Sequence, residues 1–115
     1  PFNNQQLPPA VYFQTHVYLH QMKDEIKHDQ DDMRFYKTIG DEEAELTYSI
    51  TDDNAMDFDH TFVPESARGQ GVAGELARAG LDYARKNNYK AIASCPAVEA
   101  FVKRHPDYND IMLWP

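Results

Sequence analysis

The sequence holds a single cysteine, Cys95, among its 115 residues. One cysteine cannot form an internal disulfide or a zinc site of paired cysteines, which predicts a reducing compartment and a cytoplasmic protein. No apolar run approaches the roughly 18 residues that a bilayer span needs, so we expect no membrane partner. His16 and His20 have helical spacing but lack the glutamate of a zinc-protease motif, and we therefore expect no metal.

Basic residues are scarce: 11 lysines and arginines stand against 19 aspartates and glutamates, for a net charge of −8. Sequence-independent binding to nucleic acid needs a basic surface, so we expect no nucleic-acid partner. The imbalance is local, because residues 23–59 hold 13 acidic and 4 basic side chains, whereas residues 60–115 hold 6 and 7. The acidic half suits a cationic partner, and it equally suits solvated turns that keep a protein in solution.

Hydrophobic residues make up 42% and charged residues 26% of the chain, as in a folded domain. We predict one domain over residues 25–115, preceded by an N-terminal extension of residues 1–24. Alternating apolar positions between Val11 and Leu19 suit a strand, whereas Pro8 and Pro9 suit the start of a helix. The pattern does not decide between the two.

Alternating apolar positions predict three strands, at residues 34–39, 44–50 and 56–62. Short polar turns join them, which predicts an antiparallel meander. In the third strand, Met56, Phe58, His60 and Phe62 share one parity. The alternation therefore places His60 on the apolar face of the sheet.

The pattern then changes to helical spacing over residues 72–86. A short apolar strand at residues 89–94 follows, and Pro96 suits the first turn of a helix that runs to residue 104. This order predicts the α/β (α+β) class, with a mainly antiparallel, mixed sheet and flanking helices.

A glycine-rich segment, residues 68–74, joins the third strand to the first helix. Glycines let a backbone approach a ligand, and the first amides of a helix lack internal partners, so the segment is suited to bind phosphate, with Arg68 at its rim. The segment also contains Gly-x-Gly-x-x-Gly, but the next strand ends without the acid of a dinucleotide fold, and no Gly-Lys-Ser/Thr follows as in an ATP loop. A connector without a ligand is the remaining alternative.

The spacing Arg68-x-x-Gly71-x-Ala73 fits the motif Arg/Gln-x-x-Gly-x-Gly/Ala of the GCN5-related N-acetyltransferase (GNAT) superfamily. A further likeness lies in three segments: residues 44–48, residues 59–64 leading into 68–71, and residues 81–85 followed by 95–96 and 103–108. Over about residues 25–112 the chain resembles the small YjdJ-type subfamily. The resemblance implies a minimal GNAT fold, acetyl-CoA as cofactor, and transfer of acetyl to a protein or small-molecule amine by direct attack in a ternary complex. The chain lacks room for two helices that wall the acceptor site in larger members, which implies an open acceptor site.

The resemblance also implies a set of cofactor-binding residues. We expect a monomer or a homodimer as the assembly. The expected cofactor-binding residues are Phe62, Val63, Arg68, Gly69, Gln70, Gly71, Val72, Ala73 and Gly74. A non-catalytic acyl-CoA-binding module is the alternative function.

The catalytic candidates are His60 and Cys95. An unperturbed histidine has a pKa of about 6.5 and suits base chemistry at neutral pH, although a histidine on an apolar face is often a core residue. Cys95, at the start of a helix, can act as an acid toward the leaving thiolate or as a nucleophile, or it can be a buried inert thiol. Tyr108 is a weaker candidate proton donor. Lys103 and Arg104 are candidates for the CoA 3′-phosphate.

Overall fold

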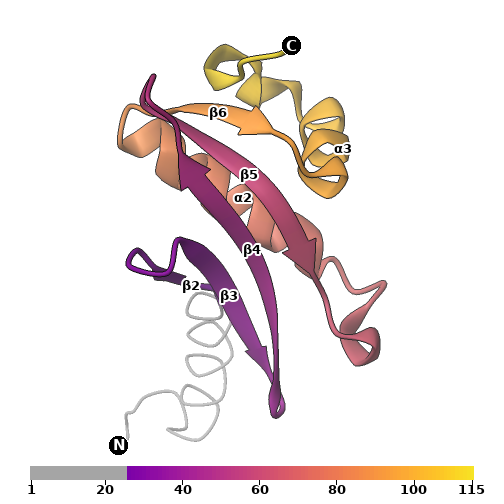
Figure 1. Ribbon diagram of the computed structural model, residues 1–115. Helices are drawn as coiled ribbons and strands as arrows, with labels where there is room; N and C mark the ends of the chain where they lie inside the picture. The colour runs from indigo at the N-terminus through magenta and orange to yellow at the C-terminus, as the bar shows by residue number, and fades with distance from the viewer. Residues whose placement is uncertain (1–25) are drawn as a thin grey trace, which may run out of the picture.

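The computed structural model describes residues 26–115 of the chain (Figure 1). The predicted extension of residues 1–24, with His16 and His20, lies outside the described residues. The described elements are β2 (Ile26–Asp29), β3 (Arg34–Ile39), β4 (Glu42–Ile50), β5 (Ala55–Phe62), the 3-10 turn η1 (Glu65–Ala67), α2 (Val72–Lys86), β6 (Lys90–Ala93), α3 (Pro96–Arg104) and the 3-10 turn η2 (Pro106–Ile111).

These strands form a 5-stranded sheet in the order β2-β3-β4-β5-β6. Successive strands from β2 to β5 pair antiparallel through short turns, and β6 joins β5 in parallel after the α2 crossover. The expected α+β class with a mainly antiparallel, mixed sheet is therefore confirmed. The strand β2 was not predicted, because its four residues carry two charges and a histidine and show no apolar alternation.

One face of the sheet carries the core. In Figure 1, α2 runs along this face behind β4 and β5. Leu76 and Leu81 of α2 are fully buried, as are Leu46 of β4 and Phe58 of β5, and α3 adds buried side chains to the same cluster. Burial of large apolar side chains at roughly 1.5–3 kcal/mol each makes this cluster the main source of stability. Within residues 26–115, no helix is long and apolar enough to cross a membrane.

A β-bulge changes the alternation in the middle of β5. Tyr48 of β4 faces Phe58, but its neighbour Thr47 faces His60, so Asp59 is the extra residue in β5. Beyond the bulge, Leu46 faces Thr61. Because directly facing residues share a side of the sheet, Thr61 lies on the core face.

The bulge also places His60 and Phe62 on the opposite face, where both are exposed. The predicted apolar-face position of His60 is therefore wrong. The prediction assumed that side chains alternate strictly along the whole strand. The single extra residue, Asp59, reverses the face on which every later side chain of β5 lies.

Candidate functional site

The glycine-rich segment forms an exposed turn at the start of α2. Gly69 and Gly71 have φ values of 81° and 82°, in the left-handed region that favours glycine. Both are exposed, and a Cβ at either position would meet no atom of the described chain within 4 Å. Glycine is therefore required by the backbone conformation, and the space in front of it is open.

The first amides of α2 are left without side-chain caps. Gly71 is the N-cap residue and has no side chain to offer, and the first α-helical bond runs from Glu75 N–H to Gly71 O at 3.0 Å. The N–H groups of Val72, Ala73 and Gly74 therefore have no partner four residues earlier in the helix. With the helix dipole, these amides favour an anion at this turn.

Two residues of the expected cofactor set also serve the packing of the helix. The Val72 side chain is buried in the core, so only its backbone can face a ligand. Gly74 is half-buried beside α3, where a Cβ would lie 3.6 Å from the Phe101 ring. Close packing against α3 is thus a second reason for a small residue at this position.

Side chains brace the turn from both ends. Arg68 Nε donates to the Val63 carbonyl at 3.0 Å, which ties the guanidinium to the residue that follows β5. Gln70 Nε2 donates to Ser66 O at 3.3 Å. Both residues are exposed. The structure therefore holds the positively charged Arg68 guanidinium beside the turn that carries the uncapped amides.

The strands β5 and β6 pair over only part of their length. β6 pairs with residues 55–58 of β5, and Cys95 N–H then donates to Phe58 O at 2.9 Å. β5 continues to Phe62 and pairs there with β4 alone among the described strands. In Figure 1, β6 ends beside the middle of β5. The backbone edge of residues 59–62 is therefore open, and it leads toward the glycine turn.

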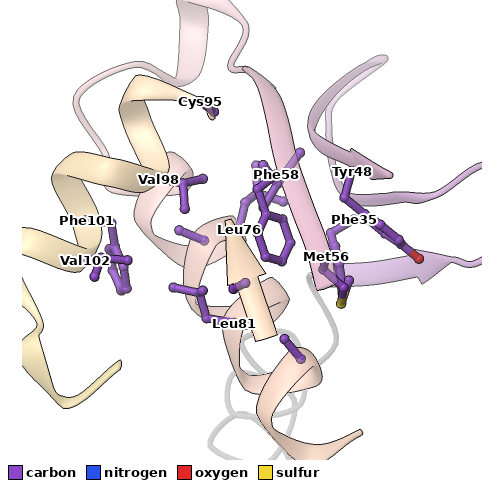
Figure 2. Packing of buried hydrophobic residues seen from close by; sticks show 14 of the residues in the cluster. Phe35, Tyr48, Met56, Phe58, Leu76, Leu81, Cys95, Val98, Phe101 and Val102 are labelled. Carbon is purple, nitrogen blue, oxygen red and sulfur yellow. The ribbon is translucent and has the colours of Figure 1, made fainter. Parts of the chain in front are cut away.

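Cys95 lies at the point where the two strands separate. Figure 2 shows it at the start of α3, one turn before Val98. Its side chain is 4% exposed and does not cap the helix. Instead, Cys95 Sγ lies 3.1 Å from Thr61 Oγ1. The alternation of apolar residues in β5 did not predict that Thr61 faces the core. Only the extra residue between Phe58 and Thr61 could have indicated this position.

His60 lies on the other face of the sheet. Its neighbour across the strands is Thr47, whose hydroxyl donates to Asp59 Oδ1 at 2.6 Å. Because His60 faces away from the core and Cys95 is buried within it, the structure does not bring the two catalytic candidates together.

The other candidates have structural partners. Tyr108 is 2% exposed, and its hydroxyl donates to Asp82 Oδ1 at 2.6 Å. Burial, and then the hydrogen bond to Asp82, raise the pKa of Tyr108 to about 12. Lys103 and Arg104 are exposed in the last turn of α3, where Lys103 Nζ lies 3.2 Å from a Glu99 carboxylate oxygen.

A cavity of about 370 Å³ lies beside β6 and the C-terminal segment. Leu113 N–H donates to Ala91 O at 2.8 Å, which holds this segment along the edge of β6. The residues that line the cavity are Ile92, Ala93, Ser94, Leu113, Trp114 and Pro115. Within residues 26–115, no three His, Cys, Asp or Glu side chains form a group that could hold a metal ion.

The mixed sheet, the open edge of β5 and the uncapped helix start define the fold of a GNAT-type protein. A family model described as GCN5-related N-acetyl-transferase matches residues 34–111, and the chain belongs to this family.

Relatives and a solved structure agree with this assignment. "Protein NATD1" of Gallus gallus is 31% identical over 84 residues, which cover 71% of this chain and 76% of the relative. "Protein NATD1" of Danio rerio is 35% identical over 74 residues, covering 63% and 67%. An NMR solution structure of a GCN5-like protein from Staphylococcus aureus is similar, with a TM-score of 0.64 and 35% identity, covering 79% of this chain and 89% of that one.

Proposed function

We propose that the protein is an acetyl-CoA-dependent N-acetyltransferase of the YjdJ type, which transfers acetyl to an amine by direct attack in a ternary complex. One observation carries the proposal: the uncapped amides at the start of α2 lie at the end of an open backbone edge of β5. The uncapped amides suit a diphosphate, and the open edge of β5 suits an extended ligand arm that contains amides.

The residues present suit the cofactor. The amides of residues 69–74 and the α2 dipole would hold the diphosphate of CoA, with Arg68 adding a positive charge. The backbone of residues 59–63, including Phe62 and Val63, would pair with the amides of the pantetheine arm. When bound, acetyl-CoA supplies an acyl thioester to an attacking amine.

Transfer needs a neutral amine, because an ammonium ion has no lone pair. As the N–C bond forms and the C–S bond breaks, the amine loses one proton and the CoA sulfur gains one. His60, exposed on the face opposite α2, would accept the proton from the amine. Cys95, at the separation of β5 and β6, would lie near the leaving sulfur. In this arrangement the two residues act from opposite sides of the sheet.

The acceptor would approach over the face that carries His60. The cross-strand neighbour of Phe62 on this face is Glu45, which forms an ion pair with Arg34, and Asp59 lies beside His60. The Asp59 carboxylate favours a cationic amine, on a protein or a small molecule. The cytoplasmic location and the monomeric or dimeric state remain predictions from the sequence.

A non-catalytic acyl-CoA-binding module is the second candidate. The separation of His60 from Cys95 favours this function. The two side chains lie on opposite faces of the sheet, so they do not form a hydrogen-bonded catalytic pair. The two functions share the binding site and differ only in turnover.

The first experiment is a thermal-shift titration with CoA. A ligand at about 100 times its dissociation constant stabilises the folded state by about 2.7 kcal/mol, and the wild-type transition should rise accordingly. Gly71→Glu puts a carboxylate at the expected diphosphate position and should abolish the shift. Gly40→Glu is the matched control, because Gly40 also has positive φ and open space but lies in the β3–β4 turn. A wild-type protein with no shift, or two variants with equal shifts, would overturn the proposed cofactor site.

The second experiment separates the two functions. The protein is incubated with acetyl-CoA and a panel of cationic amines, lysine peptides and polyamines, and CoA release is followed. Release that depends on the amine supports the transferase. Binding of CoA without amine-dependent release on any member of the panel supports the binding module.

A further inference from the structure

The cavity beside β6 has the size and the lining of a site for a small molecule. Its volume of about 370 Å³ lies within the range of about 300–1,000 Å³ that such sites have. Leu113 and Trp114, two of its lining residues, are 41% and 45% exposed although their side chains are large and apolar. The cavity therefore offers an apolar surface to a ligand that enters from solvent.

Through Ile92, the cavity adjoins the face of the sheet that carries His60. Ile92 lines the cavity and is the cross-strand neighbour of Asp57, which in turn faces Ser49 of β4. Ser49 lies two residues from Thr47, the neighbour of His60, and facing residues share a side of a sheet. Asp57 and Ile92 are therefore on the face opposite α2. Figure 1 views the sheet from this face, with no described helix in front of β5.

The carboxylate of Asp57 lacks a partner within residues 26–115. Asp57 is half-buried, and its Oδ1 atom is shielded from solvent and makes no hydrogen bond. A buried polar atom without a hydrogen bond destabilises a folded protein, and such atoms are rare. Arg34, the arginine of β3 on the same face, is paired with Glu43 and Glu45. A cation from outside the described chain would supply the partner that Asp57 lacks.

An apolar cavity beside one unpaired carboxylate selects a ligand that has both an apolar body and a single positive charge. A neutral apolar molecule would leave the carboxylate of Asp57 without its partner. A polyamine would place a second charge against the apolar lining, where that charge has no partner. An amine with one ammonium group and an apolar body meets both conditions.

We propose that Asp57 and the cavity beside β6 form the binding site of the acceptor, and that the acceptor is a primary monoamine with an apolar body. The ammonium group lies beside Asp57, and the body packs against Ile92, Leu113 and Trp114. The role as acceptor rests on the proposed function, whereas the binding of the amine does not. The bound ammonium releases one proton to solvent, and the neutral amine then attacks on the face that carries His60.

The first test is a fluorescence titration without acetyl-CoA. Trp114 is the one tryptophan of the sequence, so the whole signal comes from the cavity. Phenethylamine should give a saturable change. Its neutral counterpart 2-phenylethanol, and the polyamine spermidine, should bind about tenfold more weakly or worse, as expected when a charged hydrogen bond is lost or a second charge is buried.

Variants assign the two parts of the site. Asp57→Asn keeps the shape and removes the charge, so it should weaken phenethylamine binding about tenfold and leave 2-phenylethanol binding unchanged. Asp53→Asn makes the same change at an exposed turn position and should have no effect. Leu113→Ala removes apolar lining and should weaken both ligands severalfold.

Three results would overturn the amine site: no saturable change in Trp114 fluorescence, equal affinities for phenethylamine and 2-phenylethanol, or an Asp57→Asn variant that binds phenethylamine as wild type does. The comparison of the amine with the alcohol uses the wild-type protein, so it decides the matter even where a variant does not fold.

Turnover with acetyl-CoA distinguishes this inference from the proposed function. Phenethylamine should have a KM about tenfold below that of spermidine, and Asp57→Asn should raise this KM about tenfold with kcat within about twofold of wild type. Binding of phenethylamine without acetyl transfer to any amine would overturn the proposed function and leave the amine site standing. Equal kcat/KM for spermidine and phenethylamine would overturn the acceptor class and leave the proposed function standing.

Discussion

Gly80 of α2 lies so close to Phe58 of β5 that a Cβ at position 80 would be 2.7 Å from the Phe58 ring. The same Cβ would lie 3.3 Å from a Leu46 methyl group, and both neighbours are fully buried. This glycine therefore sets the distance between the helix and the sheet, and with it the position of the glycine turn above the end of β5.

We expect Gly80→Ala to destabilise the protein by about 1–3 kcal/mol. Alanine favours a helix over glycine by about 1 kcal/mol, but overpacking a buried core costs more. Gly74→Ala is the matched control on the same helix, because its Cβ would make ordinary contact with Phe101 at 3.6 Å. It should be neutral or stabilising by up to about 1 kcal/mol. Denaturant unfolding of both variants measures the difference, and equal effects would contradict the packing argument.

Tyr108 predicts a loss of stability at alkaline pH. Its pKa is raised to about 12 in the folded protein, chiefly by burial and next by its hydrogen bond to Asp82, whereas an unfolded tyrosine has a pKa of about 10. A raised pKa stabilises the folded state below pH 10, and this contribution is lost as pH rises from 10 to 12.

The measurement is the free energy of unfolding of wild type and Tyr108→Phe at pH 9 and pH 11. The advantage of the wild type over the variant should shrink by about 1 kcal/mol across this interval. Other tyrosines and lysines titrate equally in both proteins, so the difference isolates Tyr108. An advantage that stays constant or grows with pH would show that the Tyr108 hydroxyl is not held in its neutral form.

Most of the fold was predictable because its signals are local. The helix over residues 72–86 and the helix from Pro96 to Arg104 have the predicted bounds, since apolar spacing and a first-turn proline mark them. The strands β3, β4 and β5 were also predicted, because turns rich in polar residues separate them. β2 was missed because it pairs at an edge through polar residues.

The site was only partly predictable because two of its features depend on tertiary structure. Glycines before a helix indicate a turn with open amides, which the structure has at Gly69 and Gly71. The bulge at Asp59 depends on how β4 and β5 pair, so the sequence alone placed His60 on the wrong face and did not indicate Thr61. The separation of β5 from β6 likewise follows from the crossover geometry.

The positions of His60 and Cys95 lead to a prediction about their independence. His60→Gln changes an exposed side chain, so the free energy of unfolding should change by less than about 0.5 kcal/mol. If His60 accepts the amine proton, turnover with acetyl-CoA should fall about 100-fold or more, while the thermal shift with CoA stays as in wild type. A fall in CoA binding that accounts for the lost turnover would contradict this role.

Cys95→Ala should lower turnover through a different step, because its sulfur lies on the core side of β5 and His60 lies on the other side. Groups without shared partners contribute additively to a free energy, so the double variant should lose the product of the two single effects, to within about 0.5 kcal/mol. Steady-state rates of the four proteins, measured with one amine at saturating acetyl-CoA, give this comparison. A double variant that is no slower than the slower single variant would show instead that the two residues act as one unit, and the arrangement on opposite faces of the sheet would then fail to describe the reacting protein.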